Sequence, residues 1–82
     1  PASRLATITG EPGPVDDAVT LLDLPETAEV LGPVETDGES RVVVRVPRVR
    51  GADLARALGQ LQRVRSSRKL DPVRIQVDPY SL

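Results

Sequence analysis

The spacing of the apolar residues constrains the fold of this chain more than any other feature. Along the 82 residues it changes between the period of a strand, in which every second residue is apolar, and the period of a helix. Four short segments are rich in β-branched or alternating apolar residues, as in strands with one buried face. The predicted strands span residues 5–9, 28–31, 41–46 and 73–77. Two other segments, residues 14–22 and 52–64, carry apolar side chains at the i, i+3, i+4, i+7 spacing of a helix. The predicted order of elements is therefore βαββαβ.

Proline and glycine indicate where these elements begin and end. Pro14 suits the first position of the first helix, and Gly32-Pro33 is expected to stop the second strand. Asp37-Gly38 indicates a turn that pairs the second and third strands as antiparallel neighbours, in a loop longer than a tight two-residue hairpin. Arg65 falls on the apolar side of the second helix, which indicates that the helix ends there.

Two helices on one face of a four-stranded antiparallel sheet bury such elements economically. The fold class predicted for residues 1–82, taken as a single domain, is α+β, a split-βαβ (ferredoxin-like) two-layer sandwich. We expect the strand order 4-1-3-2. The predicted core consists of Ile8, Val19, Leu22, Val30, Val42, Val44, Leu54, Leu58, Leu61, Ile75 and Val77.

The absent residue types exclude several classes of function. The chain has no Cys and no His, so it contains no cysteine or histidine zinc cluster, no disulfide framework and no Ser-His-Asp or Cys-His nucleophile. A membrane-spanning helix needs about 20 apolar residues, and the longest apolar run here is Val42–Val44. No signal-peptide pattern opens the chain. We therefore expect a domain of a larger cytoplasmic protein, with no membrane contact.

The net charge of −1 conceals a strong asymmetry along the chain. Residues 1–40 hold nine acidic residues and one base, whereas residues 41–69 hold nine bases and one acidic residue. Such asymmetry is a recognised sign of contact with a polyanion. The other interpretation is that the acidic and basic halves pair with each other across the fold. The sequence leaves both interpretations open.

Three short motifs resemble one known family. They are residues 28–34, with the sequence Ala-Glu-Val-Leu-Gly-Pro-Val, then Ser67-Arg68-Lys69, then Val77-Asp78-Pro79. In order and spacing they resemble the C-terminal domain of PriA, the family of bacterial primosomal replication-restart proteins. The resemblance covers the chain from about Leu5 to Leu82, and its ten Arg against one Lys are similar to actinobacterial members.

The resemblance implies a module of a multidomain protein that recognises stalled or branched forks. It implies a fold similar to that of a small-subunit ribosomal protein, nucleoid association, and three partners: branched or single-stranded DNA, the tail of single-stranded DNA-binding protein, and other domains of the same chain. The family's helicase motifs, ATP site and zinc sites lie in other domains, and in some members the helicase motifs are degenerate. This chain has no Walker motif, so we expect no catalytic activity and no cofactor in it.

The basic residues between positions 41 and 69 are the candidate DNA- or partner-binding residues. Arg48 and Arg50 are the best candidates, because the family also has a basic stretch before the second helix. Arg68 and Lys69 match the family's turn residues, but they could equally cap helix carbonyls. Arg56 and Arg63 lie opposite the apolar arc of the second helix and could form a plain exposed face. The full set is Arg45, Arg48, Arg50, Arg56, Arg63, Arg68 and Lys69.

The sequence also bears on how DNA would be bound. RNA-recognition sheets of this topology stack bases on aromatic side chains, and Tyr80 is the only aromatic residue here. Any DNA contact is therefore expected to be directed at backbone phosphates and independent of base sequence. The alternative is a structural docking module with no DNA contact. An acylphosphatase-like enzyme has a similar topology but needs a catalytic asparagine, and the chain has no Asn.

Overall fold

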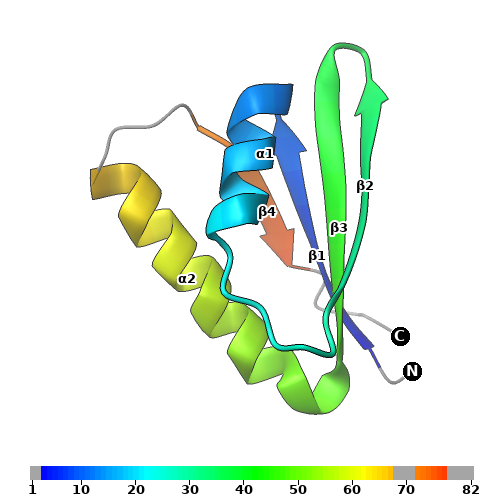
Figure 1. Cartoon of the computed structure of the whole chain (residues 1–82), viewed down its shortest axis with the longest axis vertical. Helices are drawn as coiled ribbons and strands as arrows, with labels where there is room; N and C mark the ends of the chain where they lie inside the picture. The colour runs from blue at the N-terminus through cyan, green and yellow to red at the C-terminus, as the bar shows by residue number, and fades with distance from the viewer. Residues whose placement is uncertain (1–2, 68–71, 78–82) are drawn as a thin grey trace.

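The fold is known from a computed structural model, which describes residues 3–67 and 72–77. The elements are strand β1 (Ser3–Gly10), helix α1 (Pro12–Leu21), strands β2 (Glu29–Thr36) and β3 (Glu39–Pro47), the short 3-10 turn η1 (Arg48–Arg50), helix α2 (Gly51–Ser67) and strand β4 (Arg74–Val77). This is the predicted βαββαβ order. Figure 1 shows the two helices on the same side of the sheet.

The four strands form one antiparallel sheet in the order β2-β3-β1-β4. The longest pairing joins β1 to β3, from Ser3 opposite Pro47 to Gly10 opposite Ser40. Strand β4 pairs with the other edge of β1, with Thr9 opposite Arg74. The predicted strand order and the α+β, ferredoxin-like two-layer fold are therefore confirmed.

The core lies between the helices and the two central strands. Its fully buried side chains come from alternate positions of β1 and β3 and from one face of each helix. They are Ala6, Ile8, Val15, Ala18, Val42, Val44, Val46, Leu54, Leu58 and Leu61. Six members of the predicted core are among them, and Val19, Leu22 and Ile75 pack against them half-buried. The periodicity of β3 and α2 thus identified their buried faces correctly.

Two predicted core residues, Val30 and Val77, are exposed, so that part of the core prediction was wrong. Their side chains retain 43% and 47% of their accessible surface. Both lie on the edge strands, β2 and β4, whereas α1 contacts β1 and β3 and α2 contacts β3. Val30 is paired with the buried Val44, yet every residue of β2 is exposed. A strand's apolar pattern does not reveal whether a helix covers it.

The β2–β3 hairpin differs from its prediction in two ways. Strand β2 continues through Gly32-Pro33 to Thr36, and the pairing register shifts between Leu31 and Val34. The edge position tolerates the proline, because that strand needs hydrogen bonds on one side only. The turn is a tight one of two residues, Asp37 and Gly38, both with positive φ (53° and 80°), as expected for a type I′ turn.

Gly32 is required where the register of β2 shifts. Its φ is +104°, and a Cβ atom there would lie 2.8 Å from the carbonyl oxygen of Arg41 on the neighbouring strand. Side-chain-bearing residues rarely adopt this φ, and the carbonyl leaves no room for one. The glycine therefore allows the strand to continue rather than ending it.

Both helices extend further than predicted. Helix α1 begins at Pro12, two residues before Pro14, and the Val15 N–H donates to the Glu11 carbonyl at 3.0 Å. Helix α2 continues past Arg65 to Ser67. Arg65 keeps only 6% of its accessible surface, and its Nη1 atom is itself buried, so the whole side chain is largely withdrawn from solvent. An arginine on the apolar side was therefore not a sign that the helix ends.

Candidate nucleic-acid interface

The junction between β3 and α2 is an exposed basic segment. Strand β3 ends at Pro47, the turn η1 follows at once, and α2 starts at Gly51 without a connecting loop. Arg48 and Arg50 are both exposed, and Val49 between them retains 88% of its accessible surface. The whole turn therefore projects into solvent. Both guanidinium groups are available to a ligand that approaches this end of the sheet.

A third arginine, Arg4, joins them from the other end of the sequence. Arg4 on β1 pairs with Val46 on β3, directly before the turn. Its side chain runs past the start of α2: a Cβ atom on Gly51 would lie 3.2 Å from its Cγ and 3.5 Å from its Nε. We call Arg4, Arg48 and Arg50 the basic end. The sequence analysis missed Arg4, since it lies in the acidic half of the chain.

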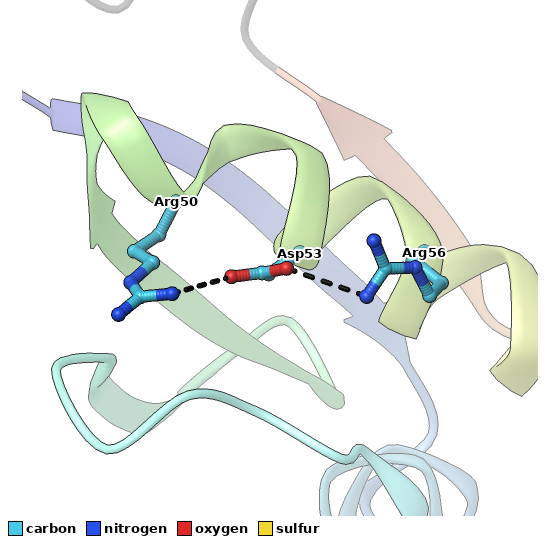
Figure 2. A network of polar contacts seen from close by, with 3 residues as sticks. All are labelled: Arg50, Asp53 and Arg56. Atoms are coloured by element: carbon cyan, nitrogen blue, oxygen red, sulfur yellow. Dashed lines mark hydrogen bonds and ion pairs between the residues drawn. The ribbon is translucent and has the colours of Figure 1, made fainter.

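The carboxylate of Asp53 links the basic end to a further arginine on α2. Arg50 donates to Asp53 Oδ2 at 3.2 Å, and Arg56 donates to Asp53 Oδ1 at 3.3 Å. Figure 2 shows the two guanidinium groups approaching Asp53 from opposite sides. The arginine side chains are 54% and 66% exposed and that of Asp53 is 31% exposed, so water screens both pairs. Together the three side chains carry one net positive charge.

Farther along α2, Arg56 and Arg63 are exposed, as their place opposite the apolar arc predicted. Seven residues of helix separate them by about 10 Å along the axis. Both border shallow hollows between α2 and the segment that follows α1, and Asp23 lies opposite each of them. The structure thus places Arg50 directly before α2, and Arg56 and Arg63 along the helix, leading away from the basic end.

Arg45 belongs to a different surface. It lies on the uncovered face of the sheet and donates to Glu29 Oε2 on β2 at 2.6 Å, with the two residues opposite each other in the pairing. On the same sheet, Arg74 donates to Glu39 Oε1 at 2.8 Å. The pair of Arg45 with Glu29 joins the basic residues 41–69 to the acidic residues 1–40, so the two halves of the chain do pair here. Arg45 is therefore not brought together with the other candidates.

Two predicted site residues, Arg68 and Lys69, lie outside the described residues. At the last described turn of α2, the Ser67 hydroxyl donates to the Val64 carbonyl at 3.0 Å, which satisfies one free carbonyl of the helix end. Whether the two basic residues cap the remaining carbonyls or bind a ligand stays a prediction.

Within residues 3–67 and 72–77, no group of three His, Cys, Asp or Glu side chains is arranged to hold a metal ion. None of the helices in the same residues is long and apolar enough to cross a membrane.

Comparison with known proteins identifies the family. The model of the primosomal protein N C-terminal domain matches residues 1–80. A relative from Mycobacterium leprae (strain TN), described as a probable replication restart protein PriA, is 34% identical over 99 aligned positions. The alignment covers the whole chain but only 15% of that relative. No solved structure matches the chain significantly. With a family match over nearly its full length and a relative aligned from end to end, the chain belongs to the PriA family as a C-terminal domain.

Proposed function

We propose that this domain holds branched or single-stranded DNA through backbone phosphates at its basic end, within a replication-restart protein. One observation carries the proposal: strand pairing brings the half-buried Arg4 to the same end of the sheet as the exposed Arg48 and Arg50, although more than 40 residues separate it from them. The family membership supports the setting, and the relative's printed description names replication restart.

The chemistry of the basic end suits phosphate. Guanidinium groups form paired hydrogen bonds with phosphate oxygens, and each neutralised phosphate releases counterions. The strands of the described sheet carry no aromatic side chain on which a base could stack. Binding should therefore follow the charge of the backbone, fall steeply with salt and depend little on base sequence. The acidic tail of single-stranded DNA-binding protein would compete for the same surface.

We also propose that the domain has no catalytic activity and binds no cofactor of its own. Any ATP and zinc sites of the whole protein would then lie in its other domains, because the aligned region makes up 15% of the relative. A cytoplasmic protein associated with the nucleoid would fit this role.

A second candidate function, docking against other domains without DNA contact, is favoured by strand β2. Val30, Leu31 and Val34 on this edge strand retain 43%, 47% and 59% of their accessible surface. Exposed apolar residues that gather on one strand often mark a contact with another protein surface. The two functions differ in one measurable property, which is salt-dependent affinity for DNA.

The test is binding of the 82-residue chain to a labelled forked DNA across a salt series. We expect the logarithm of the affinity to fall linearly with the logarithm of the salt concentration, with a slope of about −0.7 to −0.9 for each phosphate contacted. Arg48→Ala with Arg50→Ala should make that slope shallower by about 2 units. Circular dichroism verifies that the variant is folded.

The matched control removes two arginines from the open sheet face, Arg41→Ala with Arg74→Ala. It changes the net charge by the same amount at the opposite end of β3, and we expect a much smaller effect on DNA binding. An unchanged affinity in the folded Arg48 and Arg50 double variant would refute the DNA proposal. Absence of wild-type binding at low salt would favour the docking function instead.

A further inference from the structure

Asp53 lies between two exposed arginines, Arg50 and Arg56. It is the one acidic residue between positions 41 and 69, and its two carboxylate oxygens each accept an N–H from a different arginine. Figure 2 shows this bridge from Arg50 to Arg56. Two oxygens of a phosphate group could accept the same two N–H groups, because carboxylate and phosphate bind guanidinium groups in similar geometry.

We propose that Asp53 is an internal competitor for phosphate and limits how tightly the domain binds DNA. This inference rests on the proposed function. In the free domain the carboxylate holds Arg50 and Arg56; when DNA binds, a backbone phosphate replaces it and Asp53 turns to solvent. The domain therefore binds DNA less tightly than the same arginines would without the competing carboxylate.

The distances indicate that this exchange is easy. Strong charge-assisted N–H to oxygen bonds measure about 2.7–2.9 Å. The contacts of Asp53 are longer, at 3.2 and 3.3 Å, whereas Arg45 and Glu29 on the sheet lie 2.6 Å apart. One carboxylate shared between two guanidinium groups satisfies neither of them fully. Both arginine side chains are also more than half exposed, so an incoming phosphate can reach them.

A purely structural role for Asp53 predicts a different result. Asp53 lies in the first turn of α2, where a negative charge interacts favourably with the helix dipole. Its removal should therefore lower the melting temperature slightly in either case. Only the competitor role predicts tighter DNA binding and a steeper salt dependence.

The experiment measures forked-DNA binding by Asp53→Asn across the salt series. We expect the affinity at low salt to rise about twofold to thirtyfold, the range given by freeing two exposed ion pairs. The slope should steepen by up to about one unit. Asp53→Glu keeps the carboxylate and should bind DNA close to the wild-type level. If Asp53→Asn does not fold, Asp53→Ser offers a neutral side chain that can still accept a hydrogen bond from the first turn.

The matched control is Asp37→Asn, which adds the same charge at the other end of the sheet. The tight turn accepts this change, because Asn-Gly is also favoured in type I′ turns. Figure 1 shows that turn at the opposite end of β3 from η1. Asp37→Asn should not raise the DNA affinity. The gain in affinity of Asp53→Asn should shrink when Arg56→Ala is added to it.

Four outcomes would overturn the inference. Weaker binding by Asp53→Asn would mean that the carboxylate aligns the arginines for DNA. A gain equal to that of Asp37→Asn would mean that only net charge matters. Unchanged affinity and slope, with salt-dependent binding by the wild type, would remove Asp53 from the mechanism and leave the proposed function standing. Absence of wild-type binding would overturn both.

Discussion

The open face of the sheet and the basic end both carry arginines, but they use them differently. On the sheet, strand pairing sets Arg45 directly opposite Glu29, and Arg74 on β4 reaches across β1 to Glu39 on β3. At the basic end, Arg50 shares the single carboxylate of Asp53 with Arg56. The charge asymmetry of the sequence is thus neutralised on one surface and retained on the other.

The difference follows from the geometry of the elements. Neighbouring strands lie about 5 Å apart, so opposite charges on a pair of strands meet as soon as the register is set. A turn between a strand and a helix has no paired strand beside it. Arg48 and Arg50 are exposed because Pro47 ends the pairing and α2 begins immediately, and Arg50 meets only the carboxylate of Asp53 in the first turn of α2. The strand-to-helix junction is therefore the place where basic residues remain available to a ligand.

The largest expected effect comes from reversing a charge at the basic end. Arg48→Glu replaces attraction for phosphate by repulsion and should reduce forked-DNA affinity at low salt by about tenfold or more. Fluorescence anisotropy with a labelled fork measures it. Arg45→Glu makes the same charge change on the sheet, where it should destabilise the fold by facing Glu29 but have a much smaller effect on DNA affinity. An equal loss of DNA affinity in the two variants would show that the basic end and the open face of the sheet do not differ in DNA binding.

A smaller effect is expected for Arg4→Ala. This residue tests whether the pairing of β1 with β3 completes the basic end, because nothing else in residues 1–40 carries a positive side chain. Removing one phosphate contact should make the salt slope shallower by about one unit, with affinity reduced at all salt concentrations. Arg4→Lys, which keeps the charge, should retain most of the slope. A slope that does not change in Arg4→Ala would restrict the site to η1 and α2.

The sequence predicted the order of the elements, the antiparallel sheet and its strand order, since each depends on local periodicity and on how such elements pack. It also predicted the exposed positions of Arg48, Arg50, Arg56 and Arg63. These residues lie on local features, a turn and the polar side of one helix, for which no knowledge of distant partners is needed.

The failures have non-local causes. Val30 has the pattern of a buried residue, but its burial depends on whether a helix lies above its strand. Gly32-Pro33 resembles a stop signal, yet a register shift against Arg41 lets β2 continue. Arg4 belongs to the basic end, and Arg45 does not, because of the residues that lie beside each of them: Val46 and the start of α2 for Arg4, and Glu29 for Arg45. The order of the strands does not specify these partners, since they depend on the exact pairing register and on how α2 packs.

The smallest effect is expected for the ion pair on the sheet. Arg45→Ala and Glu29→Gln, combined in a double-mutant cycle and followed by urea unfolding, should give a coupling energy of about 0.2–1 kcal/mol. The side chains are 43% and 55% exposed, so added salt should weaken the coupling, and at 1 M, where charges are screened within about 3 Å, little should remain. Neither variant should change the salt slope of DNA binding. A shallower slope for Arg45→Ala alone would show that phosphate competes with Glu29 as well, and the open face would then join the basic end as one DNA-binding surface.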